Sequence, residues 1–189
     1  MLYRFVALLL LILLTPVFLV LYILVILTSG GPFLFKQKRM GKDKKTFIIY
    51  KIRTMVRNAE KLKEKYKNQN EADSPAFKIY DDPRYTKVGK IISHSALDEL
   101  PQLFNIVKGE MSFVGPRPLP VDEAQKIPRE YTTRFSVLPG MTSPWIINGA
   151  DHKSFKKWME LDITYIKNKN FSYDIKIFSL TVLKALKLL

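Results

Sequence analysis

The sequence predicts a mainly helical α/β protein made of an N-terminal membrane segment, residues 1–31, and one small cytoplasmic domain, residues 32–189. Two observations support this division. An almost wholly apolar run, Phe5 to Leu27, contains no charged residue. Every charged residue except Arg4 lies at or after Lys36, in a stretch long enough to bury a modest core. We therefore expect a few short strands and several amphipathic helices after the apolar run, some of them at the membrane interface.

The apolar run is interrupted at its centre by Thr15-Pro16. At about 1.5 Å per helical residue the run could cross a bilayer. Proline lacks an N–H and clashes with the preceding turn, so a helix kinks or breaks there. The run is therefore either a bent span or a helix–break–helix that dips into the membrane and returns. A cleaved signal peptide is a third alternative, although its apolar region is normally only about 7–15 residues long.

Local patterns divide the rest of the chain. Gly30-Gly31-Pro32 ends the membrane element, and Gly109 is placed to cap a helix C-terminus. The final helix can be read either as core packing or as a helix lying in the membrane interface. The β-branched and aromatic content and the apolar spacing predict strands at 46–52 and 111–114, helices at 55–67, 87–92, 99–108, 154–167 and 172–189, and a polar loop at 68–83.

The chain is strongly basic, with a net charge of +14 over 189 residues. Such a surface attracts nucleic acid, anionic lipid headgroups or phosphorylated substrates. Beside a membrane segment the lipid and phosphate readings are favoured, since a nucleic-acid binder would rest on charge alone. The lysines and arginines that directly follow the apolar run place the domain in the cytoplasm. The absence of cysteine excludes disulfides and thiolate metal sites, and His94 and His152 lack the spacing of a zinc site.

Asp98-Glu99, within the segment SALDELPQ, is the first candidate for chemistry. The plain structural explanation is a helix start, because Asp is a preferred N-cap and Glu fits the first turn. The functional explanation makes Asp98 a nucleophile and both carboxylates ligands of a metal ion. A carboxylate can attack a phosphoryl group and so divide a difficult transfer into two easier steps. Mg²⁺ typically takes one or two carboxylates together with substrate oxygens.

Arginines and lysines form the second group of candidates. Arg117 lies between two prolines, so it is either part of a structural turn or a guanidinium that a rigid turn aims at a phosphate. Lys51 and Arg53 alternate with apolar residues on a predicted strand and therefore share one face. Arg39 lies in the basic stretch that follows the membrane segment, where lipid attraction is the simpler explanation.

Taken together, these motifs resemble the bacterial sugar transferase family, the monotopic phosphoglycosyl transferases that act on a polyprenol phosphate. The resemblance runs almost from end to end, and the order of the motifs makes it specific. The motifs are Thr15-Pro16, QxRxG at 37–41, KIRTM at 51–55, LDELPQL at 97–103, GEMSFVGPRP at 109–118, PGMT at 139–142, DxxYxxN at 162–168, and then Asp174 and Thr181.

The resemblance implies a two-step reaction in the first membrane stage of polysaccharide or glycoprotein synthesis. Asp98 would attack a UDP-sugar and release UMP, and a polyprenol phosphate would then take the sugar-phosphate from Asp98. Asp98 and Glu99 would hold Mg²⁺, and the phosphate-binding set would be Arg117, Lys51, Arg53, Arg39 and Arg134. The resemblance also implies a re-entrant membrane segment bent at Thr15-Pro16 and a catalytic domain on the cytoplasmic face of the bacterial plasma membrane. Membrane lipid is an expected partner and nucleic acid is not, and a homodimer is compatible with the resemblance.

The chain departs from the family pattern around residue 146. The family commonly has glutamine and arginine where this chain has Ile146 and Ala150, and often a basic residue near Ser93-His94-Ser95. These changes bear on sugar or nucleotide recognition more than on the Asp-Glu chemistry, and Arg134 is one residue that could compensate. They also motivate an alternative, a non-catalytic membrane-bound relative that binds lipid phosphate or acts as a scaffold.

Overall fold

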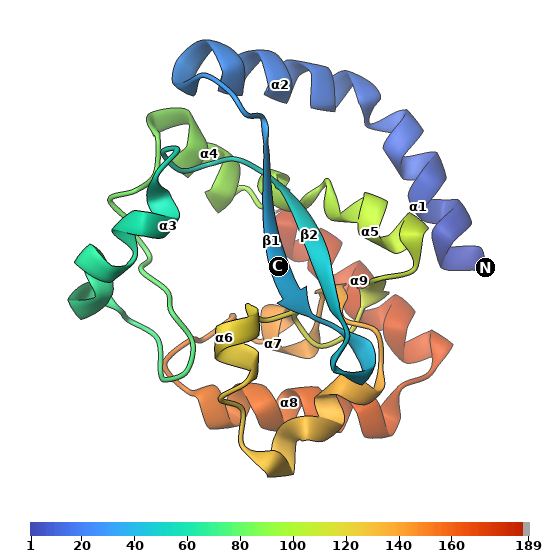
Figure 1. Cartoon of the computed structure of the whole chain (residues 1–189). Coiled ribbons are helices and arrows are strands. Elements are labelled where there is room, and N and C mark those ends of the chain that lie inside the picture. The colour runs from blue at the N-terminus through green and yellow to red at the C-terminus, as the bar shows by residue number, and fades with distance from the viewer. Residues whose placement is uncertain (187–189) are drawn as a thin grey trace.

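The computed structural model describes residues 1–186, and it begins with two apolar helices, α1 (Leu2–Leu13) and α2 (Thr15–Ser29). They are bent by 59° at Leu14, next to the predicted break (Figure 1). Pro16 cannot donate to the preceding turn, and the Thr15 hydroxyl donates to the Leu11 carbonyl at 3.1 Å. Among the described residues no individual helix has the length and apolar character to cross a bilayer, whereas the bent pair does when its helices are taken together.

An antiparallel hairpin follows, made of β1 (Leu34–Met40) and β2 (Thr46–Ile52), with the 3-10 turn η1 (Lys42–Lys44) between them. β2 has the predicted bounds. β1 is missing from the sequence prediction, which assigned its lysines to the juxtamembrane basic segment. Lys36 and Lys38 are exposed and alternate with partly buried neighbours, so the basic residues follow the period of two of a half-buried strand.

The middle of the chain carries short helices around a long loop. The helix predicted at 55–67 is instead a pair, α3 (Ala59–Leu62) and the 3-10 helix η2 (Glu64–Gln69). The first of them begins after residue 55 because Met55 pairs with Tyr85 as an isolated bridge. The remaining elements are α4 (Lys87–His94), the 3-10 turn η3 (Leu97–Glu99) and α5 (Gln102–Lys108). Gly109 ends α5 in the left-handed region, at φ 78°, which confirms it as the C-terminal cap.

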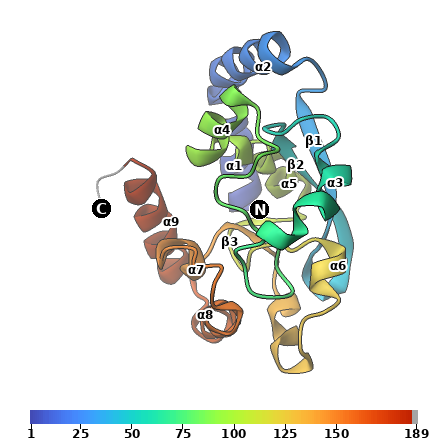
Figure 2. The ribbon, with the colours of Figure 1, turned by 90° about the vertical axis from the view of Figure 1, so that its left-hand side faces the viewer.

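The C-terminal half is mostly helical. Strands β3 (Ser112–Val114) and β4 (Gly140–Thr142) form a short parallel pair. The predicted final helix begins one residue earlier, and its last residues, 187–189, lie outside the described part of the chain. The helices are α6 (Val121–Ala124), the 3-10 helix η4 (Arg129–Ser136), α7 (Pro144–Ile147), α8 (Phe155–Asn168) and α9 (Phe171–Ala185). Figure 2 shows α7, α8 and α9 on one side of the molecule and the β1–β2 hairpin on the other.

The apolar helices are built into the core of the domain. Ala7 of α1 is fully buried in a cluster with Leu103 and Ile106 of α5. Leu21 and Val25 of α2 are buried in a cluster that also holds Ile52 and Ile92. The apolar helix pair therefore contacts strand β2 and the helices α4 and α5, which flank η3.

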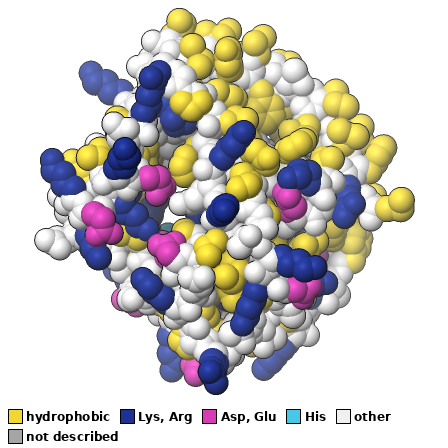
Figure 3. All heavy atoms as spheres, in the orientation of Figure 1, with side chains coloured by type: hydrophobic (Ala, Val, Ile, Leu, Met, Phe, Trp, Pro, Cys, Tyr) yellow, Lys and Arg dark blue, Asp and Glu magenta, His cyan; other side chains and the backbone are white. Residues whose placement is uncertain are grey.

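One region of the surface is apolar. Large hydrophobic side chains are exposed along both N-terminal helices, and Figure 3 shows hydrophobic side chains gathered over the region where Figure 1 places them. Lysine and arginine side chains are spread over the face that carries the hairpin. This distribution suits a protein that meets lipid on one side and water on the other. The exposed residues of α1 and α2 include Leu2, Phe5, Leu8, Leu9, Ile12, Leu13, Leu19, Val20, Ile23 and Leu27.

Candidate active site

Asp98 and Glu99 lie in η3, between two helices of the core. Ala96, at φ 57°, reverses the chain after α4, and Pro101 stands at the N-terminal end of α5. Asp98 does not cap α5, since its carboxylate accepts a hydrogen bond from Lys51. The N-cap explanation for Asp98 is therefore wrong, because Pro101 stands at the N-cap of α5 with no side-chain cap, and both carboxylates lie in the first turn of η3 and contact Lys51.

Lys51 of β2 and Arg117 bring positive charge to both carboxylates. The Lys51 ammonium lies 2.7 Å from Glu99 Oε1 and 3.3 Å from Asp98 Oδ2. Arg117 donates from Nη2 to Glu99 Oε1 at 2.8 Å. The four side chains are largely but not fully shielded, with side-chain exposures of 9–27 %. Charge-assisted contacts of this length hold the groups in fixed relative positions.

The two carboxylates have different electrostatic environments. Burial raises the pKa of Asp98, and Lys51 only partly offsets this effect. Burial alone would also raise the pKa of Glu99, but Arg117 and Lys51 together hold it well below its usual range. Glu99 is thus the carboxylate that interacts most strongly with Lys51 and Arg117, and its negative charge raises the pKa of Arg117. Asp98 keeps the less compensated charge, which favours it as the reactive group.

Two further arginines hold the turn that presents Arg117. Arg39 donates from Nη1 to the Pro118 carbonyl at 2.9 Å. Arg134 donates from Nη2 to the Arg117 carbonyl at 2.9 Å, and it also binds the carboxylate of Asp162 at 2.8 Å. The Arg134–Asp162 pair is almost completely buried. The turn is therefore fixed through its backbone by two guanidinium groups.

The structure brings together most, but not all, of the residues predicted from the sequence. Lys51, Asp98, Glu99 and Arg117 contact one another, while Arg39 and Arg134 lie behind the turn and bind its carbonyls. Arg53 lies at the end of α2, where its Nη2 and Nε bind the carbonyls of Ser29 and Pro32, while its Nη1 binds the Met55 carbonyl.

Lys78 is a neighbour of the site that the sequence did not reveal. Burial, together with the charges of Arg117 and Lys51, lowers the pKa of Lys78. Its backbone N–H binds Asn70 Oδ1 at 2.8 Å, so the loop that carries it is anchored by an asparagine side chain. A lysine in a polar loop has no periodic pattern that would mark it. Only the position of the loop in the fold shows its proximity.

The two adjacent carboxylates supply only part of the oxygen ligands that a magnesium ion needs. Among the described residues no group of three or more acidic, histidine or cysteine side chains is placed to hold a metal ion. Asp98 offers the oxygen Oδ1, to which Lys51 does not donate, and Glu99 lies next to it. Since Mg²⁺ commonly takes one or two carboxylates plus substrate phosphate oxygens, these donors suit it once a phosphate is present.

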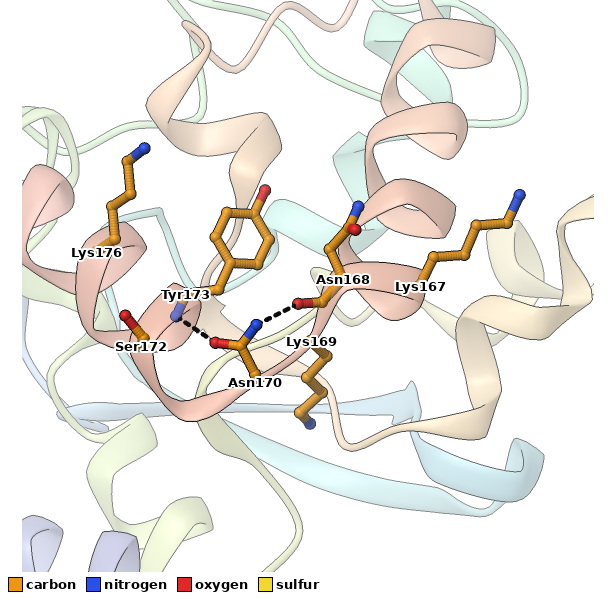
Figure 4. Close-up of a pocket in the computed structure, with 7 residues that line it drawn as sticks. All are labelled: Lys167, Asn168, Lys169, Asn170, Ser172, Tyr173 and Lys176. Carbon is orange, nitrogen blue, oxygen red and sulfur yellow. Dashed lines mark hydrogen bonds between the residues drawn. The ribbon is translucent and has the colours of Figure 1, made fainter.

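A separate hollow of about 520 Å³ lies at the junction of α8 and α9 (Figure 4). Its lining includes the three lysines 167, 169 and 176, together with Asn170, which caps α9. None of Lys51, Asp98, Glu99 and Arg117 contributes to this lining. We therefore assign the candidate chemistry to the carboxylate pair and not to this hollow.

A carboxylate of raised pKa, a lysine and a rigidly presented arginine have the make-up of a phosphoryl-transfer site. The site belongs to a domain built onto an apolar helix pair. Comparison with known proteins gives the class a name. The chain belongs to the bacterial sugar transferase family, whose model matches residues 1–188.

Individual relatives agree with this assignment. The chain is 41 % identical to the galactosyl transferase CpsE of Streptococcus agalactiae over 82 % of its length and 34 % of that protein. It is 41 % identical to the uncharacterized sugar transferase EpsL of Bacillus subtilis over 85 % of this chain and 73 % of the relative. It is also 38 % identical to the UDP-glucose:undecaprenyl-phosphate glucose-1-phosphate transferase of Klebsiella pneumoniae, over 94 % of this chain and 37 % of that protein. The chain thus spans about a third of two of these relatives and most of the other.

Proposed function

We propose that this protein transfers a sugar-1-phosphate from a UDP-sugar to a polyprenol phosphate. Asp98 would attack the β-phosphorus, and the bond to the bridging oxygen would break and release UMP. The sugar-phosphate would remain on Asp98 as an acyl phosphate. An oxygen of the polyprenol phosphate would then attack the same phosphorus, giving polyprenol-diphospho-sugar and restoring the carboxylate.

The single observation that carries the proposal is the unequal pair of carboxylates. Glu99 accepts hydrogen bonds from both Lys51 and Arg117, whereas Asp98 accepts one from Lys51 only, through a single oxygen. An anionic diphosphate that enters would compete with Glu99 for Arg117 and Lys51, and this competition would bring its phosphorus beside the Asp98 carboxylate. The same cations would then stabilise the charge that grows on the transferring phosphate.

Magnesium is part of the proposal. Asp98 and Glu99 would hold Mg²⁺ together with oxygens of the substrate, and the ion would supply charge neutralisation at the diphosphate. The residues of the chain have the other tasks: Lys51 orients both carboxylates, and Arg117 binds phosphate. The names of the relatives support the substrates, because the Klebsiella pneumoniae protein is named for UDP-glucose and undecaprenyl phosphate.

The helix pair supports a location at the membrane. We propose that α1 and α2 enter one leaflet and return, so that both ends face the cytoplasm and the site lies near the headgroups of the bacterial plasma membrane. The 59° bend and the exposed apolar side chains support this arrangement. The basic hairpin that follows would face anionic headgroups.

The test is release of UMP from a panel of UDP-sugars in detergent, with Mg²⁺ and polyprenol phosphate present. Asp98→Ala should abolish release. Asp81→Ala is the matched control, because Asp81 is exposed and pairs only with Lys90 among the described residues. Release by Asp98→Ala at the wild-type rate would refute the proposal.

A second candidate rests on the substitutions at Ile146 and Ala150, where the family commonly has polar side chains. The protein would then bind lipid phosphate or organise other proteins without catalysis. A folded wild-type protein that releases no UMP from any UDP-sugar of the panel would favour this candidate.

A further inference from the structure

The C-terminus of α2 is held by an arginine that lies outside the catalytic contacts. Arg53 donates from Nη2 to the carbonyl of Ser29 at 3.0 Å and also to the carbonyl of Gly30. Its Nε donates to the Pro32 carbonyl at 2.7 Å. Its backbone N–H binds the Phe33 carbonyl at 2.8 Å. Arg53 therefore forms hydrogen bonds along the whole connection between the apolar helix pair and β1.

Arg53 has the burial of a core residue, with 6 % of its surface exposed. Among residues 1–186 no carboxylate forms an ion pair with it. Its positive charge faces the end of α2, where unpaired carbonyls and the helix dipole concentrate negative charge. The sequence of α2 itself has no basic residue in its last turn, so Arg53, the residue that follows β2, supplies the positive charge that helices usually carry at this end.

Arg53 also stands two residues from Lys51, the lysine that contacts both carboxylates. The Ile52 side chain between them is buried against Leu21 and Val25 of α2. The path from the apolar helix to Asp98 is thus short: carbonyls of α2, Arg53, the end of β2, and Lys51. Hydrogen bonds join Arg53 to the end of α2, the backbone of residues 51–53 joins it to Lys51, and ion pairs join Lys51 to the carboxylates.

We propose that Arg53 is a positioning residue that sets the depth of the carboxylates relative to the bilayer. This inference rests on the proposed function. A water-soluble UDP-sugar reaches the carboxylates at any depth, but the phosphate of a polyprenol lies at the height of the headgroups. Removing the hydrogen bonds of the Arg53 guanidinium should therefore impair the transfer to lipid more than the first step on the UDP-sugar.

The experiment compares two rates in nanodiscs for Arg53→Met. The first is exchange of labelled UMP into UDP-sugar without lipid acceptor, and the second is complete transfer to polyprenol phosphate. We expect the ratio of transfer to exchange to fall at least tenfold, with a rise in KM for the polyprenol phosphate. Arg129→Met, at an exposed arginine of η4, is the matched control and should leave the ratio unchanged.

A second readout needs no turnover. Because the chain has no cysteine, Ile91→Cys on the exposed side of α4 gives one labelling site for a fluorophore whose depth is measured with quenchers at known positions in the lipid. Arg53→Met should shift or broaden the depth of this label. If Arg53→Met does not fold, Arg53→Lys, which keeps the charge but loses the planar fork, is judged by the same two criteria.

The outcomes separate the two proposals. An unchanged ratio with active wild type overturns the role of Arg53 and leaves the proposed function standing, even if both rates fall together. A wild type that catalyses neither rate refutes the proposed function, and the depth measurement then decides on Arg53 alone. An unaltered depth of the label in Arg53→Met overturns the inference in either case.

Discussion

Replacing the buried Arg134–Asp162 pair should separate stability from activity. Arg134 binds the Asp162 carboxylate through Nε and Nη2, at 3.1 and 2.8 Å, and the Arg117 carbonyl through Nη2. Their side chains are 2 % and 0 % exposed. Arg134→Met leaves a carboxylate buried without its partner, whereas Arg134→Met with Asp162→Leu removes both charges.

The magnitude follows from burial. Removing one partner of a buried ion pair typically destabilises a protein by about 3–5 kcal/mol. Protonating a carboxyl of ordinary pKa at neutral pH costs about 4 kcal/mol, and this limits the penalty because Asp162 can escape by taking up a proton. Burial already raises the pKa of Asp162. We therefore expect Arg134→Met to lower the free energy of unfolding by about 3–4 kcal/mol, or the Tm by roughly 10 °C.

The double variant should regain most of that stability, since apolar residues often replace a buried ion pair without loss. It should not regain activity, because the Arg117 carbonyl still lacks its donor. A hydrogen bond to a charged group contributes about 1.5–3 kcal/mol, so UMP release should fall by roughly 10- to 100-fold.

Thermal unfolding in detergent and initial rates of UMP release measure the two effects on the same samples. A double variant as unstable as Arg134→Met would show that the buried charge is not the cause of the instability. A double variant with the wild-type rate would refute the idea that Arg134 positions Arg117.

Three further predictions concern single residues. Lys51→Met should lower UMP release by about 10- to 100-fold through loss of charge-assisted bonds to both carboxylates, while Lys36→Met on the exposed side of β1 should leave the rate within twofold. Gly89→Ala should lower the free energy of unfolding by about 3 kcal/mol, because a Cβ there would meet a backbone carbonyl oxygen at 1.8 Å; Gly31→Ala, with only a side-chain contact at 3.9 Å, should show little change in chemical or thermal unfolding. Burial lowers the pKa of His152 to about 4, so the unfolded chain binds that proton first and the protein loses stability as the pH falls from 6.5 towards 4. In His152→Phe the fall in Tm over this interval should be smaller, and an identical fall would contradict the assignment.

Local patterns predicted much of the fold. The β-branched run at 46–52 is β2 with the same bounds, and the apolar spacing of 154–167 corresponds to α8 within one residue. Gly109 was identifiable because few other residues tolerate its backbone conformation. The two elements and the helix cap could be predicted because each is determined by residues close to it in the sequence. β1 was missed because its exposed lysines alternate with partly buried residues in a short basic stretch, and charge beside an apolar segment had a simpler explanation.

The sequence predicted the residues that contact one another in the candidate site, but not the roles of the arginines around them. Asp98 and Glu99 stood out as adjacent carboxylates, and Lys51 and Arg117 lay in motifs of their own. The roles of Arg39, Arg53 and Arg134 depend on which carbonyl or carboxylate the fold places beside each guanidinium. An arginine binds phosphate and backbone carbonyls through the same donors, so the sequence alone could not distinguish a binding residue from one that holds a turn or a helix end.

In the proposed reaction Asp98 carries the sugar-phosphate. The direct measurement is the intact mass of the protein after brief incubation with its UDP-sugar and Mg²⁺, without lipid acceptor, followed by acid quench and peptide mapping. We expect an added mass of one sugar-phosphate on the peptide that contains Asp98, absent from Asp98→Asn and lost when polyprenol phosphate is supplied. UMP release at the full rate of turnover with no adduct on that peptide, or an adduct on another residue, would contradict it.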